Sequence, residues 1–80
     1  MRSYRQMIFA DRQKIATLYE NNERVETIAE ALGYNRASVY DELKRGFMGE
    51  MDKNGRPEYS AELAQRKVFE RRRKQLVAAE

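Results

Sequence analysis

The 80-residue sequence contains no cysteine and no histidine. Without cysteine the chain has neither disulfides nor thiolate metal ligands, and without histidine the common zinc sites are excluded as well. The same absence removes histidine as a general acid or base, and the acids Glu50, Asp52 and Glu58 lie in a polar stretch with no nucleophile beside them. We therefore expect no enzyme activity, no cofactor, no metal site and no small-molecule substrate.

Long apolar runs are also missing, so the sequence predicts no membrane-spanning segment. The first residues, Met-Arg-Ser-Tyr-Arg, lack the apolar core of a signal peptide. These features predict a cytoplasmic protein with no membrane partner. A chain of this length forms one small domain that buries only about 60% of its unfolded surface, so a partner that adds core would stabilise it.

Charge is unevenly distributed along the chain. Sixteen Lys and Arg against thirteen Asp and Glu give a net charge of only +3. Residues 20–30 nevertheless hold four acids and one base, whereas residues 66–74 hold six bases and one acid. Such segregation suits a molecule that turns one side toward a polyanion. A solvated basic helix is the alternative for the second run alone.

The stretch 25–45 has the pattern of two short helices joined by a tight turn. Ile28, Ala29 and Leu32 recur at helical spacing and are followed at once by Gly33, which suits a left-handed helix end. Asn35 is a good N-cap for a helix that follows. The arrangement predicts a helix-turn-helix, with residues 36–45 as the helix offered to the major groove. An ordinary helical hairpin is the alternative.

We predict an all-α fold in a single domain that spans residues 1–80. Residues 1–45 form a small three-helix core, residues 46–59 a loop or small wing, and residues 60–80 a basic C-terminal helix. The first helix is expected at about residues 11–20, and the asparagines at 21 and 22 should end it. The predicted core of the three helices consists of Ile15, Leu18, Ile28, Ala29, Leu32, Val39 and Leu43.

The segment between the helix-turn-helix and the last helix allows two structures. Glycines and an Asn54-Gly55 pair favour either an irregular linker or a short hairpin with a type I′ turn. Pro57 argues against a regular returning strand, so the linker is the expected outcome. Ser60 is the predicted N-cap of a last helix over residues 61–77, whose first half should be docked and whose second half should be solvated.

Three segments of the chain resemble the N-terminal helix-turn-helix of insertion-sequence-thirty-type transposases. They are residues 4–12 (YRQMIFADR), 28–33 (IAEALG) and 37–45 (ASVYDELKR), and residues 59–66 are similar to the segment that follows in that family. The resemblance implies binding to the terminal repeats of the element and repression of its own promoter. Ile8 stands where the family usually has a helix-capping threonine. The family's acidic catalytic domain lies downstream of this region, so strand cleavage is not implied here.

Residues on the outward and N-terminal faces of the second helix of the pair are the candidates for DNA contact. Arg36 is the strongest, because a guanidinium can bond both acceptors of a guanine edge. Tyr40 suits a thymine methyl or a phosphate, and Asp41 suits a cytosine amino group or an ion pair with Arg45. The predicted DNA-binding residues are Arg36, Ala37, Ser38, Tyr40, Asp41, Lys44, Arg45, Arg71, Arg72, Arg73 and Lys74.

The sequence thus favours a double-stranded DNA-binding protein, a small transcriptional regulator of a phage or another mobile element. One alternative is a separated DNA-recognition arm of a transposase. An alternative of another class is an interaction module that binds an acidic protein partner. One helix-turn-helix reads few base pairs, so we also expect a homodimer. The surfaces available for pairing are the apolar residues around Leu63, Val68 and Phe69 and the group Phe47, Met48 and Met51.

Overall fold

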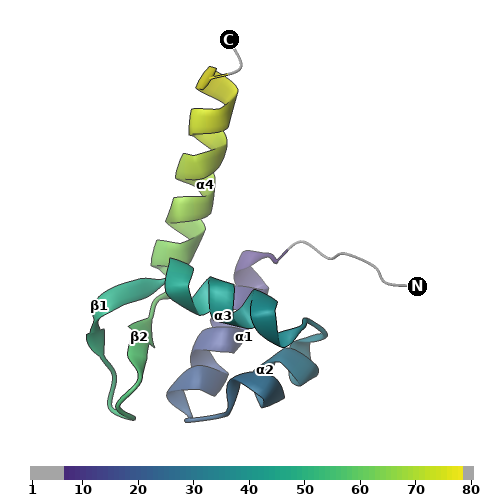
Figure 1. The fold of residues 1–80 in the computed structure, drawn as a ribbon, viewed down its shortest axis with the longest axis vertical. Coiled ribbons are helices and arrows are strands. Elements are labelled where there is room, and N and C mark those ends of the chain that lie inside the picture. Colours follow the sequence, from purple (N-terminus) through teal and green to yellow (C-terminus); the bar gives the residue numbers. More distant parts are fainter. Residues whose placement is uncertain (1–6, 79–80) are drawn as a thin grey trace.

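The computed structural model describes the backbone of residues 7–78 and the side chains of residues 7–73. Within that part, four helices and two strands follow in the order α1 (Phe9–Glu20), α2 (Val25–Leu32), α3 (Arg36–Arg45), β1 (Phe47–Met51), β2 (Pro57–Tyr59) and α4 (Ala61–Ala78). Figure 1 shows α1, α2 and α3 gathered together, with the β1–β2 hairpin beside them and α4 projecting away. None of the described helices is both long and apolar enough to cross a membrane.

Helix α1 begins at Phe9, two residues before the predicted start. Its N-cap is Ile8, whose side chain makes no capping hydrogen bond. The carboxylate of Asp11, at position N3, supplies the other bond of a capping box, because its Oδ2 accepts a 3.2 Å hydrogen bond from the Ile8 backbone N–H. The helix ends at the asparagine pair as predicted, with Asn21 as C-cap and Asn22 in the left-handed region at φ 67°.

The tight turn between α2 and α3 has the predicted geometry. Gly33 adopts φ 80°, and its N–H donates to the carbonyl of Ala29 at 2.9 Å. Asn35 caps α3, since its side-chain oxygen accepts from the backbone N–H of Ser38 at 2.8 Å. Both signals are local, which is why the sequence alone locates this turn.

The core contains most of the predicted residues and several others. Ile15, Ile28, Ala29 and Val39 are buried as expected, while Leu18, Leu32 and Leu43 pack against them only partly buried. The additional buried hydrophobic residues are Tyr19, Val25, Tyr59, Ala61 and Ala64. Three of these lie after residue 46, so the hairpin and the first turns of α4 belong to the same core as the helix-turn-helix.

The expectation of an irregular linker is wrong, because residues 47–59 form an antiparallel hairpin. Phe47 lies opposite Tyr59 and Met51 opposite Pro57, with an irregularity in β1 between them. Gly49, at φ 92°, lies within that irregularity. Pro57 is tolerated because it is the first residue of β2. The fold is therefore mostly helical with a small sheet, and not purely α.

The turn of the hairpin also differs from the predicted type I′. A type I′ turn needs positive φ at both central residues, and here Gly55 has φ 76° while Asn54 does not share that conformation. The N–H of Gly55 donates to the carbonyl of Asp52, and the Asp52 side chain accepts from the backbone N–H groups of Asn54 and Arg56. An aspartate-centred turn of this kind fixes the loop through side-chain bonds.

The tip of the hairpin closes the C-terminal end of α1. The Asn54 side chain donates to the carbonyl of Glu20 at 3.0 Å. The Arg56 guanidinium donates to the carbonyls of Glu23 and Tyr19 at 2.8 and 2.5 Å and lies 4.0 Å from the centre of the Tyr19 ring. A cation at this end of a helix satisfies carbonyls that have no partner within the helix. These contacts explain why the segment folds back and does not remain a linker.

Helix α4 begins where the sequence predicts. The hydroxyl oxygen of Ser60 accepts from the backbone N–H of Leu63 at 3.1 Å, so Ser60 is the N-cap. Ala61 and Ala64 are buried, Leu63, Gln65 and Val68 are half-buried, and the other described side chains from Arg66 onward are exposed. The docked first half and the solvated continuation agree with the prediction as far as Arg73.

Candidate nucleic-acid interface

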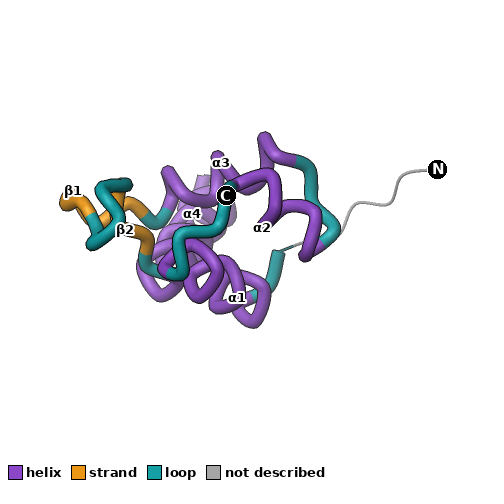
Figure 2. The backbone as a smooth tube through the Cα atoms, turned by 90° about the horizontal axis from the view of Figure 1, so that it is seen from below, coloured by secondary structure: helices purple, strands orange, loops and turns teal. Residues whose placement is uncertain are grey.

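A groove of about 950 Å³ runs between α3 and α4 and extends to the start of α1. Figure 2, turned by 90° and seen from below, looks nearly along the axis of α4, with the labels of α1 and α3 on either side of it. The groove is lined by Met7, Arg12, Tyr34, Ser38, Asp41, Lys44, Arg45, Lys67, Val68, Arg71 and Arg72. Its basic residues outnumber its single acid, Asp41. A concave basic surface beside a helix-turn-helix is suited to a phosphate backbone.

The basic residues of α4 lie on two faces of the helix. Lys67, Arg71 and Arg72 line the groove toward α3. Arg66 and Arg73 are exposed but do not line it. The predicted Arg71 and Arg72 therefore face the predicted reading helix, while Arg73 does not. Lys74 lies outside the described side chains. Lys67 was missed, although its i, i+4 spacing from Arg71 is visible in the sequence.

The outward ridge of α3 carries the predicted reading residues. Arg36, Ala37, Tyr40, Asp41 and Lys44 are all exposed, whereas Val39 is fully buried. The Arg36 side chain is 64% exposed and forms a 3.4 Å ion pair with Glu26 of α2. Ser38 is half-buried at the groove wall. The ridge between the N-terminus of α3 and Lys44 is thus accessible to a base edge.

Tyr40 faces away from the basic groove. It is 46% exposed and lines a second, more apolar hollow that is bordered by Val25, Leu43, Phe47 and Pro57. Tyr40 is therefore not part of the buried core.

Arg45 has a structural contact that the sequence did not suggest. It forms an ion pair with the buried carboxylate of Glu42, one turn earlier in α3. The alternative pairing with Asp41 is replaced by this one. Because the Arg45 side chain remains 32% exposed at the groove wall, a guanidinium held by Glu42 still presents part of its charge to the groove.

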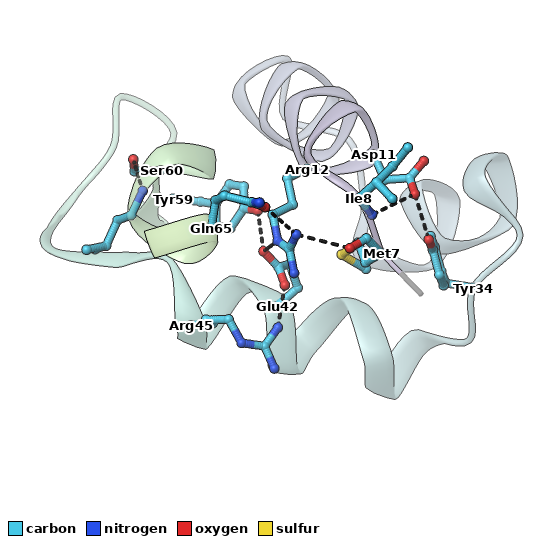
Figure 3. A network of polar contacts seen from close by, with 11 residues as sticks. Met7, Ile8, Asp11, Arg12, Tyr34, Glu42, Arg45, Tyr59, Ser60 and Gln65 are labelled. Atoms are coloured by element: carbon cyan, nitrogen blue, oxygen red, sulfur yellow. Dashed lines mark hydrogen bonds and ion pairs between the residues drawn. The ribbon is translucent and has the colours of Figure 1, made fainter. Parts of the chain in front are cut away.

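Glu42 is the centre of a buried polar network, shown in Figure 3. Its side chain is 0% exposed and accepts hydrogen bonds from Arg12 Nε at 2.8 Å, from the Tyr59 hydroxyl at 2.6 Å and from Arg45. The Arg12 side chain is itself only 5% exposed, and its Nη1 donates to the Met7 carbonyl at 3.1 Å and to Gln65 Oε1 at 2.7 Å. The network joins α1, α3, β2 and α4.

Sequence reasoning missed this network, although one signal for it existed. Glu42 lies three residues after Val39, so helical spacing places it on the same inward face. The donors that make its burial tolerable come from distant parts of the chain: Arg12 is 30 residues away and Tyr59 is 17. A buried carboxylate with three donors is well satisfied, and the loss of one partner would be costly.

Two pKa shifts report on these surroundings. Burial, with the hydrogen bond to Glu42 added, raises the pKa of Tyr59 far above its usual range. On α2, the pKa of Glu26 is lowered by a hydrogen bond from its own backbone N–H, with Arg36 contributing as well. Tyr59 therefore stays neutral as a donor, and Glu26 stays ionised beside Arg36.

The acids of the described residues form no group of three or more that could hold a metal ion. The hairpin contributes little positive charge to the interface, since Lys53 and Arg56 are set against Glu50, Asp52 and Glu58. The basic surface is consequently built by α3 and α4.

Comparison with known proteins is consistent with this geometry. The sequence profile of a helix-turn-helix domain matches residues 3–46, more than half of the chain, and this domain occurs in the N-terminal regions of transposases. The match ends at Gly46, directly after α3. No curated protein and no solved structure matches the sequence. The left-handed turn at Gly33, the capped α3 and the profile match together show that the chain belongs to this family of helix-turn-helix domains, and a domain of this kind suggests DNA binding.

Proposed function

We propose that this protein binds double-stranded DNA sequence-specifically and acts as a small transcriptional regulator of a mobile element or phage. In this proposal α3 enters the major groove with Arg36, Ala37, Tyr40 and Asp41 toward the bases. Lys44, Arg45 and the basic face of α4 hold phosphates beside it. The resemblance to insertion-sequence-thirty-type transposases supports the link with mobile elements.

The observation that carries the proposal is the placement of Lys67, Arg71 and Arg72. They lie across the groove from Ser38, Asp41 and Lys44 of the reading helix. A protein that bound only an acidic protein partner would not need its basic helix face turned toward α3. A duplex suits this arrangement, because its phosphates flank the groove that α3 would enter.

Selection of bound sequences from a random duplex pool at moderate salt tests the proposal. We expect enrichment of one motif. Failure to enrich any motif would favour the other class of function, an interaction module for an acidic protein. A separated transposase arm would also enrich a motif. That motif would match the terminal repeats of an element, whereas the motif of a regulator would match a promoter.

Two charge-matched variants test the geometry. Arg71→Gln with Arg72→Gln removes two charges that face α3, whereas Arg66→Gln with Arg73→Gln removes two that do not. Each neutralised phosphate contact contributes about −0.9 to the slope of log K against log salt, so the first variant should flatten that slope by about 1.8. The second should change it little. Equal effects of the two variants would argue for a nonspecific electrostatic attraction.

We also propose that the protein binds as a homodimer on an inverted repeat. A module of this size buries about 600–1,000 Å², which is little for discrimination against a genome of competing sites. Phe47, Met48, Met51 and Phe69 are between 43% and 62% exposed, and a second copy would cover such apolar side chains. Sedimentation of the free protein and of its DNA complex provides the test. One protein per duplex at saturation, on a site without dyad symmetry, would contradict the dimer.

A further inference from the structure

Helix α4 is attached to the rest of the protein through very few side chains. Its buried residues, Ala61 and Ala64, are small, and beyond Gln65 only Val68 among the described side chains is half-buried. Alanine packing brings two helices close but supplies little directional restraint. The direction of α4 must therefore depend largely on hydrogen bonds near its base.

Gln65 supplies one such bond at the point where α4 leaves the core. Its Oε1 accepts from Nη1 of Arg12 at 2.7 Å, and the same guanidinium binds Glu42 of α3 through Nε at 2.8 Å. Tyr59, just before α4, provides a second link, because its hydroxyl donates to Glu42 at 2.6 Å. Both links end on the same buried carboxylate of the reading helix (Figure 3).

We infer that Gln65 and Tyr59 are positioning residues, which hold α4 at a fixed angle to α3 so that its basic face and the reading helix engage one duplex together. The inference deepens the proposed DNA binding and rests on it for its functional consequence. The structural part, a fixed angle between α3 and α4, can be measured without DNA.

The length of α4 beyond Gln65 explains why the angle between α3 and α4 matters. Arg72 lies seven residues beyond Gln65, about 10 Å along the helix at 1.5 Å per residue. A tilt of about 20° at Gln65 would displace it by roughly 3–4 Å. Charge-assisted hydrogen bonds to phosphate require donor–acceptor distances near 2.7–2.9 Å, so a displacement of that size breaks them. Loss of the Gln65 hydrogen bond at the base of α4 would therefore break the contact of Arg72 with a phosphate.

The absence of cysteine from the sequence makes a direct measurement simple. Ala37→Cys on α3 and Glu70→Cys on α4, both at exposed positions, would carry two spin labels in the full chain. With no other substitution, we expect a narrow distribution of the distance between the two spin labels. Gln65→Leu should broaden it or shift its mean by several Å, and Gln65→Glu should restore it because a glutamate keeps an acceptor for Arg12.

DNA binding, measured in the chain without the two cysteines, provides the second readout. Gln65→Leu should flatten the salt slope by the same amount as Arg71→Gln with Arg72→Gln, about 1.8, while the preferred base sequence stays the same. Combining these changes should flatten the slope no further, because both remove the same contacts. Gln65→Glu should return the slope to that of the unmodified chain.

The outcomes separate the inference from the proposed function. A narrow, unshifted distance distribution in Gln65→Leu would overturn the inference, whether or not DNA binds. A broadened distribution in a protein that binds no duplex would support the fixed angle and reject only the DNA-binding role. If Gln65→Leu does not fold, Tyr59→Phe takes its place in the labelled background, and an unchanged distribution there would overturn the inference as well.

Discussion

The Tyr59 hydroxyl donates a 2.6 Å hydrogen bond to the carboxylate of Glu42, and both side chains are buried. Arg12 and Arg45 bind the same carboxylate. One glutamate therefore connects the reading helix to the hairpin and to the first helix. It makes position 42 more important for folding than an acid on a helix usually is.

Glu42→Ala should strongly destabilise the protein. The change leaves Arg12 buried without its ionic partner, and breaking a buried pair in this way costs about 3–5 kcal/mol. That is a large part of the stability of so small a domain. Urea unfolding followed by circular dichroism measures the loss. Glu58→Ala, on the hairpin, is the control, and a similar small effect for both variants would contradict the role of the network.

Alkaline pH should destabilise the protein through Tyr59. Its pKa is raised in the folded state by burial and by Glu42, above the ordinary value of 10.0 that the unfolded chain restores. The contribution of the neutral Tyr59 hydroxyl to the free energy of unfolding is therefore complete below pH 10. It is lost as the pH rises above 10, by up to about 1.4 kcal/mol per pH unit. Unfolding free energies measured across this range should fall less steeply for Tyr59→Phe than for the unmodified protein.

Arg36→Ala should alter sequence preference and leave stability nearly fixed. The side chain is 64% exposed and its pairing with Glu26, at 3.4 Å, is a surface contact. Substitutions at such positions change folding by less than about 0.5 kcal/mol, whereas a lost bidentate contact to guanine costs about 1–3 kcal/mol of discrimination. Comparison of selected motifs and melting temperatures tests both parts. If Arg36→Ala lowered the melting temperature and still selected the same DNA motif, Arg36 would serve folding and not base recognition.

Gly46→Ala should destabilise the junction of α3 and β1 through crowding. A Cβ at this position would come within 2.5 Å of the Tyr59 ring and 2.7 Å of the Ser60 carbonyl oxygen. Overpacking of this kind costs about 1–3 kcal/mol. Gly33→Ala is an instructive comparison, because its Cβ would meet nothing within 4 Å and its cost arises from φ 80° alone. Thermal melting of the two variants measures the effects, and an unchanged melting temperature for Gly46→Ala would show that Tyr59 can move aside.

The sequence by itself determined the helix-turn-helix and the ends of most helices. Gly33, Asn35 and Ser60 act on backbone groups within a few residues of themselves, and the apolar spacing of Ile28 and Val39 identifies one buried face on each helix. Signals of this range do not depend on the rest of the fold. The reading ridge of α3 follows from the same periodicity.

Only the tertiary structure decided the hairpin, the buried network and the basic groove. Asn54 and Arg56 fold the hairpin back because they satisfy carbonyls at the end of α1, more than 30 residues earlier. Glu42 can be buried because Arg12 and Tyr59 arrive from other elements. Which basic residues of α4 line the groove toward α3 depends on how α4 docks against the other elements. Partners distant along the chain, such as Arg12 for Gln65, set that docking, and no local pattern encodes it.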